Sequence, residues 1–396
     1  MQRSKLPIRF KNSDVDYTFQ WMLSYGAYGG LSFGEAFSIA AQIDEHSPAS
    51  WVHAFHDFAE LLRERAADLL RQGKLRSAGE TCLKAFNAER SAVQLMSPRD
   101  PAFIERVRAF KADFAAAMSY LGLPVAAVEI AYADQRLPGW FLKASRGARR
   151  GPTLIQIGGG DSYCEDLYFF GGAAGYLRGY NLLLADLPGQ GDTPALGLHF
   201  TEAYDAPVRA VVDHVLARRD VDPRRLAIFG MGGGGYFVTR GAAREQRLKA
   251  CAASTPILDV SKVVNAEMPA AIARTPMFMG GLLQKMAANM SPAARVSIDK
   301  YLWQFGVTDI AAGLAITRSW QVDPEQITCP VLCLAGESDT PECVRQAREL
   351  YEKARGPGKS LRIFTEHEGA DAHCQVNNLP LQHQVLFDWL DDVFAR

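Results

Sequence analysis

The sequence lacks long hydrophobic runs: no stretch of 18 or more uncharged apolar residues occurs among its 396 residues. This absence argues against a membrane span. The first residues, MQRSKLPIRFKNSDVDY, include basic side chains but no apolar core of a secretory signal, so we expect no such signal. Excess charge is also missing. The formal net charge of −1 gives no reason to expect nucleic acid or an anionic membrane as a partner.

Metal-binding patterns are scarce as well. The seven cysteines form no CxxC pair and no Cys/His spacing typical of a metal site, which favours a reduced, cytoplasmic protein. His53 and His56 could suit a metal by their spacing, but no third ligand is apparent. We therefore expect ordinary helix histidines, no metal and no cofactor.

Residues 1–124 have a helical pattern. In the stretch SPASWVHAFHDFAELLRERAADLLRQGK, apolar residues recur at helical spacing, with Ser50 as the expected N-cap and Gly73 as the expected end. Two further amphipathic helices are predicted in SAGETCLKAFNAERSAVQLM and DPAFIERVRAFKADFAAAMSYLG. We interpret residues 1–124 as an N-terminal helical region.

From residue 125 onward, short apolar strand-like runs alternate with helical segments. This alternation predicts an α/β fold, with a mostly parallel sheet and helices on both faces. Residues 125–257 and 329–396 form the predicted core. The helical segment 258–328 interrupts them and is interpreted as a cap or lid beside the carboxyl ends of the strands. We expect the methionines of this segment to fill the core in preference to contacting substrate; they are Met268, Met277, Met279, Met286 and Met290.

The stretch FGMGGGGYFVTRGA, residues 229–242, joins a predicted strand to a predicted helix through consecutive glycines. Together with its flanking segments it has the chain order of an α/β-hydrolase, in which a nucleophile elbow is followed by an acid and then a histidine. The elbow motif is G-x-S-x-G, and Gly232 stands where the serine belongs. A nucleotide-binding loop is the alternative, but a suitably placed acidic ribose ligand and a Walker lysine are both missing.

Two side chains follow later strands at the positions of an acid and a base. His373 is the expected general base, and Asp339 is expected to fix its tautomer. His367 is a rival base on the same loop, and Glu337 and Asp259 are weaker acids. Asp339 could instead serve as a helix N-cap.

Backbone N–H groups should form the oxyanion hole. One comes from Gly233, after the nucleophile position, and one from Gly159 or Gly160 in the glycine turn after an early strand. Asp161 and Glu165, beside that turn, could contact substrate or cap the next helix.

Nearly the whole chain resembles the α/β-hydrolase family of the FrsA-type esterases, 2,6-dihydroxypseudooxynicotine hydrolase and the fungal polyketide-shortening hydrolases. The stretches that carry the resemblance include SPASW, LPGWFL, IGGGDSYCED, DLPGQGDTP, YLWQFGV, GESD and AHCQVNN. The resemblance implies an α/β-hydrolase fold, no cofactor and a homodimer. It also implies cleavage of an ester, or of a C–C bond beside a ketone, in an aromatic or polyketide-like substrate. Asp339 and His373 match the acid and base, whereas Gly232 does not match the serine.

Three hypotheses account for the missing serine. In the first, an engineered Ser→Gly change leaves a serine hydrolase impaired. In the second, a natural serine-less enzyme uses His373 as a base for non-covalent elimination, cyclisation, isomerisation or water-driven hydrolysis. In the third, the chain only binds an apolar small molecule. Neither Cys374 nor Cys164 lies on the elbow, which disfavours a cysteine nucleophile.

Overall fold

The computed structural model describes residues 4–144, 150–268 and 280–395. Contacts divide the chain into two compact units, which we describe separately. One unit contains Ala126–Leu283, Gln304–Arg396 and the first five residues, and the other contains Leu6–Val125 and Gln284–Trp303. Among the described residues, no helix has both the length and the apolar character needed to cross a membrane.

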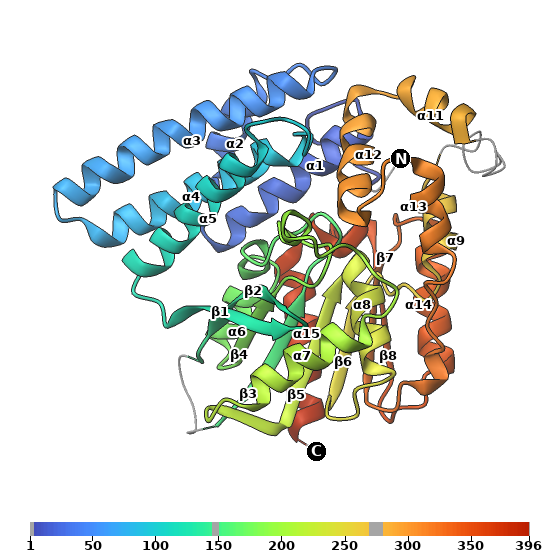
Figure 1. The fold of residues 1–396 in the computed structure, drawn as a ribbon. Helices are drawn as coiled ribbons and strands as arrows, with labels where there is room; N and C mark the ends of the chain where they lie inside the picture. Colours follow the sequence, from blue (N-terminus) through green and yellow to red (C-terminus); the bar gives the residue numbers. More distant parts are fainter. Residues whose placement is uncertain (1–3, 145–149, 269–279, 396) are drawn as a thin grey trace. The chain divides into compact units, whose positions relative to one another are not determined.

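The larger unit is built on an eight-stranded sheet with the order β1-β2-β4-β3-β5-β6-β7-β8 (Figure 1). Its strands are β1 (Val125–Tyr132), β2 (Gln135–Leu142), β3 (Gly151–Ile157), β4 (Asn181–Ala185), β5 (Val221–Met231), β6 (Ala250–Ser254), β7 (Val331–Gly336) and β8 (Ser360–Phe364). β2 pairs with β4 in antiparallel fashion, and the pairings from β4 through β8 are parallel. The mostly parallel sheet predicted from the alternation is confirmed.

Helices cover both faces of this sheet (Figure 1). They include α6 (Gly172–Leu177), α7 (Asp205–Leu216), α8 (Gly233–Ala242), α14 (Pro341–Lys353) and α15 (Leu379–Ala395). α6 packs against α15, while α7 packs against α8. Every residue of β4, β6 and β7 is buried, because helices on both sides of the sheet leave these strands no solvent-exposed face.

The parallel strands bring four loops to one edge of the sheet. β3, β5, β7 and β8 run in the same direction, so the segments after their carboxyl ends gather there. In open α/β sheets this edge is where ligands bind. The glycine turn, the elbow and the loops that carry Asp339 and His373 all begin at this edge.

The smaller unit contains the N-terminal helices α1 (Ser13–Ser24), α2 (Phe33–Ala40), α3 (Pro48–Arg71), α4 (Leu75–Gln94) and α5 (Phe103–Tyr120). α4 packs against both α3 and α5. Ser47, and not the predicted Ser50, is the N-cap of α3, and its Oγ accepts a hydrogen bond from the Ser50 N–H. Pro48 explains the shift, because its fixed φ suits the first position of a helix. α3 ends just before Gly73, whose φ is +72°.

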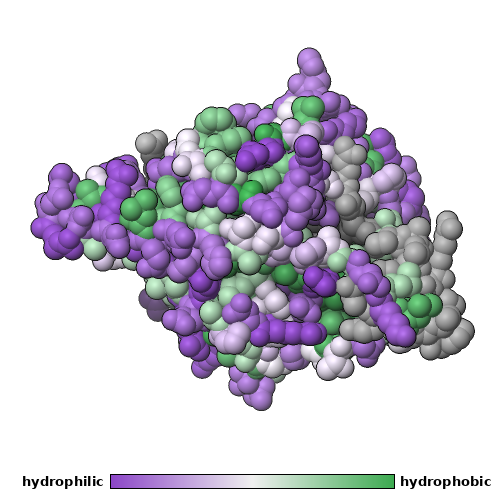
Figure 2. All heavy atoms as spheres, turned by 90° about the horizontal axis from the view of Figure 1, so that it is seen from above, coloured by the Kyte–Doolittle hydropathy of each residue, from purple (hydrophilic) through white to green (hydrophobic). Residues whose placement is uncertain are grey.

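The segment 258–328 contributes four further described α-helices: α9 (Val260–Glu267), α11 (Gly280–Ala288), α12 (Pro292–Phe305) and α13 (Ile310–Thr317). Its residues 284–303 group with the N-terminal helices, and its other described residues group with the sheet. Met277 and Met279 lie outside the described residues. On the face shown in Figure 2, hydrophobic side chains are interspersed with hydrophilic ones.

Candidate active site

The elbow connects β5 to α8 through Gly232. Its backbone has φ +54° and ψ −121°, and α8 begins at the next residue. The Gly232 N–H donates to the Ser254 carbonyl at 3.0 Å, and its own carbonyl accepts from the Gly235 N–H at 2.8 Å. Positive φ at a strand-to-helix turn is the strained geometry that displays a nucleophile in α/β-hydrolases.

Close backbone approach explains the glycines around this position. An ideal Cβ would lie 2.3 Å from a backbone oxygen at Gly230, 2.5 Å at Gly234 and 2.3 Å at Gly235. No side chain fits at such distances. At Gly232, by contrast, the nearest atoms to an ideal Cβ lie at 3.4 Å or more, which is ordinary van der Waals contact. Position 232 therefore has room for a side chain that its glycine neighbours do not have.

His373 borders the space above Gly232. Its Nε2 lies 3.4 Å from the ideal Cβ of Gly232, and its Nδ1 lies 2.8 Å from Asp339 Oδ2. His373 begins the 3₁₀ turn η7 (His373–Gln375) after β8, and Asp339 follows β7. The rival His367 is exposed in the preceding turn. The structure thus brings together Gly232, His373 and Asp339 from three distant parts of the chain.

Asp339 is buried, and both of its carboxylate oxygens have hydrogen-bond partners. Its Oδ2 accepts from the Thr255 hydroxyl at 2.8 Å as well as facing the imidazole, and its Oδ1 accepts from the Thr340 N–H at 2.8 Å. Thr340, not Asp339, is the N-cap of α14. The weaker acid candidates have other partners, since Glu337 accepts from a backbone N–H and Asp259 caps α9.

Sequence reasoning missed Thr255. It follows β6, is fully buried and has φ +62°, a rare conformation for a β-branched residue. Its N–H donates to the Leu334 carbonyl at 2.8 Å, while its hydroxyl holds Asp339. The sequence feature that could have indicated Thr255 is its position directly after β6, the strand between β5, which leads to the elbow, and β7, which leads to the acid.

The pKa values of the pair move apart. Burial opposes charge on both groups, yet the pKa of Asp339 is lowered by the charge of His373 and by the hydrogen bonds it accepts. The pKa of His373 is raised well above its ordinary value despite burial, because the Asp339 carboxylate stabilises the imidazolium, with a smaller contribution from Cys374. Such a pair can take up a proton at Nε2 and hold the resulting charge.

The glycine turn lies directly against the elbow. The Gly160 nitrogen is 3.0 Å from the ideal Cβ of Gly233, and the Gly233 nitrogen is 3.7 Å from the ideal Cβ of Gly159. The Gly159 N–H already donates to Ser162 Oγ at 2.9 Å, which favours Gly160 as the second oxyanion donor. Gly233 opens α8, and the first N–H groups of a helix have no intrahelical acceptor.

The two acidic residues after the turn differ in their surroundings. Asp161 is half-buried. Glu165 is buried, and its Oε1 accepts from the Trp140 indole N–H at 3.0 Å. Its Oε2 has no hydrogen-bond partner among the described residues, so it can still accept from a bound molecule.

One cysteine lies closer to the nucleophile position, Gly232, than the sequence suggested. Cys374 Sγ is 3.6 Å from the ideal Cβ of Gly232, and its backbone has φ +56°. Its Sγ also lies 3.9 Å from the Ser254 carbonyl oxygen. The thiol is buried and forms part of the wall of the space that a serine side chain would occupy.

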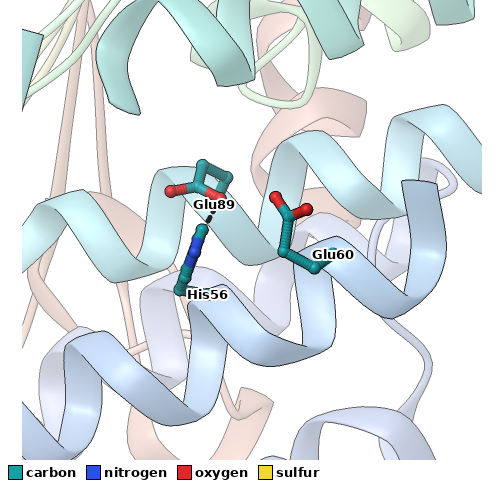
Figure 3. Close-up of side chains that lie close together, drawn as sticks. All are labelled: His56, Glu60 and Glu89. Atoms are coloured by element: carbon teal, nitrogen blue, oxygen red, sulfur yellow. Dashed lines mark hydrogen bonds and ion pairs between the residues drawn. The ribbon is translucent and has the colours of Figure 1, made fainter. Parts of the chain in front are cut away.

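A separate cluster lies within the helical unit, where His56 and Glu60 of α3 face Glu89 of α4 (Figure 3). His56 Nδ1 lies 2.9 Å from Glu89 Oε2. However, Arg63 and Arg106 each donate to a different oxygen of Glu89 at 3.0 Å. Two arginines already neutralise the buried carboxylate, so the cluster is a structural ion-pair network and not a good site for a cation.

Comparisons with known proteins agree with the fold and with the resemblance. The model of the prolyl oligopeptidase family matches residues 206–396. The 20-hydroxy-prefusarin hydrolase FUS2 of Gibberella moniliformis is 29% identical, with 98% of each chain covered. Hydrolase LUC6 of a Fusarium species is also 29% identical at the same coverage.

Solved structures show the same fold. The 2,6-dihydroxy-pseudo-oxynicotine hydrolase has a TM-score of 0.74 at 19% identity, covering 94% of this chain and 95% of that one. AbyA5 has a TM-score of 0.62 at 18% identity, covering 96% and 99%. The predicted α/β-hydrolase fold and the predicted resemblance are confirmed.

Proposed function

We propose that this chain, which has the α/β-hydrolase fold and resembles fungal hydrolases along almost its whole length, is an enzyme of hydrolase type acting on an apolar small molecule. The bond attacked is an ester, or a C–C bond beside a ketone, in an aromatic or polyketide-like substrate. One observation carries the proposal: His373 Nε2 lies 3.4 Å from the Cβ position of Gly232, while Asp339 holds the other ring nitrogen.

Each group has a role in this proposal. His373 accepts a proton from the attacking hydroxyl and returns it to the leaving group, and Asp339 orients the ring and stabilises the imidazolium. The N–H groups of Gly233 and Gly160 stabilise the negative charge that develops on the carbonyl oxygen. Gly232 is the nucleophile position, which in this chain has no side chain.

Two forms of the chemistry are compatible with that glycine. In the first, the machinery suits a serine at position 232: the Ser–Oγ bond to the acyl carbon forms, the leaving group departs with the proton from His373, and water then cleaves the acyl-enzyme. The chain with glycine is then an impaired, engineered form. In the second, a water molecule or a hydroxyl of the substrate gives its proton directly to His373 Nε2, and no covalent intermediate forms.

The proposed substrate class rests on the relatives. Several fungal relatives are named as hydrolases, one of them as a hydrolase of 20-hydroxy-prefusarin. Glu165 supports a substrate contact near the turn, because it offers a buried oxygen with no described partner; Asp161 is the second, weaker candidate. The segment 258–328 is proposed as the cap, and a homodimer in the cytoplasm remains a prediction.

Gly232→Ser is the test of this function. Strong activation on aryl esters, together with labelling by a serine-directed phosphonate, supports the serine form. Turnover by the unchanged chain that is lost in His373→Ala supports the serine-less form. Binding of an apolar ligand without turnover, unaffected by the loss of both His373 and Asp339, would instead favour a binding protein.

A further inference from the structure

The cap segment sends one polar side chain to the glycine turn. Gln304, near the end of α12, belongs to the same compact unit as the sheet. Its Nε2 donates a hydrogen bond to the Gly160 carbonyl. Gly160 is also the residue whose N–H lies against the elbow. A residue of the cap therefore holds the carbonyl group of Gly160, the residue whose N–H group we assign to the oxyanion hole.

The rest of the turn is held in the same way by a second glutamine. Gln190 Nε2 donates to the Gly158 carbonyl at 2.6 Å and to the Gly159 carbonyl at 2.8 Å. All three glycine carbonyls thus accept from side-chain amides, and the Gly159 N–H donates to Ser162. Among the described hydrogen bonds of the turn, none uses the Gly160 N–H. The pattern leaves this one donor for a ligand.

Gln304 is itself fixed by the loop that precedes α7. The Gln304 carbonyl accepts from the Phe200 N–H at 2.8 Å. The ring of the next residue, Phe305, packs edge-on against Phe200 with centroids 5.1 Å apart. An ideal Cβ at Gly306, where φ is +66°, would lie 2.7 Å from the His199 ring. Because the backbone around residue 304 is held on several sides, its amide can hold the turn.

The two glutamines differ in one respect. Gln190 Oε1 accepts from the Leu187 N–H at 2.9 Å, so its amide is used at both ends. Gln304 is 4% exposed, and its Oε1 has no hydrogen-bond partner among the described residues. A buried acceptor without a partner destabilises a protein, whereas an apolar side chain of similar shape avoids that cost. Gln304 is thus a poor choice for stability alone.

We propose that Gln304 is a positioning residue for the reaction, which holds the Gly160 carbonyl so that the Gly160 N–H faces the reacting carbonyl oxygen. The inference rests on the proposed function. It assigns a role to the stretch YLWQFGV that the acid, base and elbow do not explain.

The test compares Gln304→Met with the unchanged residue in the Gly232→Ser protein. Methionine has a similar length and volume but cannot donate to the carbonyl. We expect kcat on an aryl ester to fall roughly 10- to 100-fold, with KM within about 3-fold, because a misplaced oxyanion donor affects the transition state more than the bound substrate. The melting temperature should stay the same or rise. Gln384→Met, at an exposed position on α15, is the matched control and should change none of these values.

A second variant guards against a special effect of methionine. Gln304→Glu keeps the shape but turns a carboxylate oxygen toward the Gly160 carbonyl, so it should lose at least as much kcat. Unchanged kcat in both variants would overturn the positioning role. A loss of kcat that only follows a fall in melting temperature would also overturn it. If the Gly232→Ser protein neither reacts with the phosphonate nor cleaves esters, the serine form of the proposed function fails. Failure of the positioning role alone looks different, because the Gly232→Ser protein then cleaves esters equally fast with and without the Gln304 substitutions.

Discussion

Replacing Gly232 by serine adds a Cβ and a hydroxyl at the end of β5. The ideal Cβ lies 3.4 Å from His373 Nε2, 3.6 Å from Cys374 Sγ and 3.9 Å from the Gly159 Cα, so no neighbour has to move. The cost is conformational, because φ is +54°. A non-glycine residue in such a sparsely populated region costs about 1–3 kcal/mol. We expect the free energy of unfolding to fall by about that amount.

The gain in activity should be much larger than this cost suggests. From its Cβ position, a serine hydroxyl is one bond further out, within hydrogen-bond reach of His373 Nε2. Serine hydrolases without their nucleophile retain roughly 10³–10⁴ over the uncatalysed rate, and the complete set of groups adds about 10⁶ in kcat. The Gly232→Ser protein should therefore exceed the unchanged chain by at least about 10³-fold on an activated ester.

The assay is hydrolysis of p-nitrophenyl esters, combined with mass spectrometry of a phosphonate adduct on residue 232. Gly232→Ala is the matched control, because it carries the same Cβ and the same strain without the hydroxyl. Adding His373→Ala to the serine variant should remove the gain. A folded serine variant that is no faster than the alanine variant, and that stays unlabelled, would refute the assignment of residue 232 as the nucleophile position.

Three further outcomes are expected. In the Gly232→Ser protein, kcat/KM should rise with pH through a pKa above 6.5, because the imidazole must be neutral to accept a proton and the Asp339 carboxylate raises the pKa of His373. Asp339→Asn should move this rise to lower pH and reduce the plateau of kcat/KM. An unmoved pH profile would contradict the pairing of Asp339 with His373. Gly230→Ala should lower the melting temperature more than Gly232→Ala, because its Cβ would lie 2.3 Å from a backbone oxygen and the cost should reach or exceed the upper end of the about 1–3 kcal/mol typical of overpacking. Equal melting temperatures would show that close backbone approach does not explain the glycine at position 230. Glu89→Gln should reduce the free energy of unfolding in urea by up to about 3 kcal/mol, because it removes the carboxylate from two partly buried arginines, and an unchanged midpoint would show that the network contributes little.

Much of the fold could be predicted because it depends on local pattern. Runs of apolar residues between helical segments predicted a covered parallel sheet, and strands such as β4 and β7 are completely buried. The start of α3 was misplaced by three residues, because several serines precede the helix and only the fixed φ of Pro48 decides among them. The boundaries of the cap were set by composition, and composition carries no information about which unit a helix joins.

The candidate site was predictable only in part. The order elbow, acid, histidine pointed to Gly232, Asp339 and His373, since each follows a strand of one parallel sheet. Thr255 and Gln304 were missed, because each acts through a hydrogen bond to a residue 84 or more positions away in the chain. Spacing along a sequence cannot indicate such contacts.

The sequence by itself determined the types of element, their order, and the glycines that a tight strand-to-helix turn demands. Tertiary structure decided which glycine has room for a side chain: packing forbids a Cβ at Gly230, Gly234 and Gly235 but allows one at Gly232. It also decided that a buried carboxylate faces His373 and that the Gly159 N–H is already used. These outcomes depend on distances between segments far apart in the chain, and only the folded packing of those segments sets such distances.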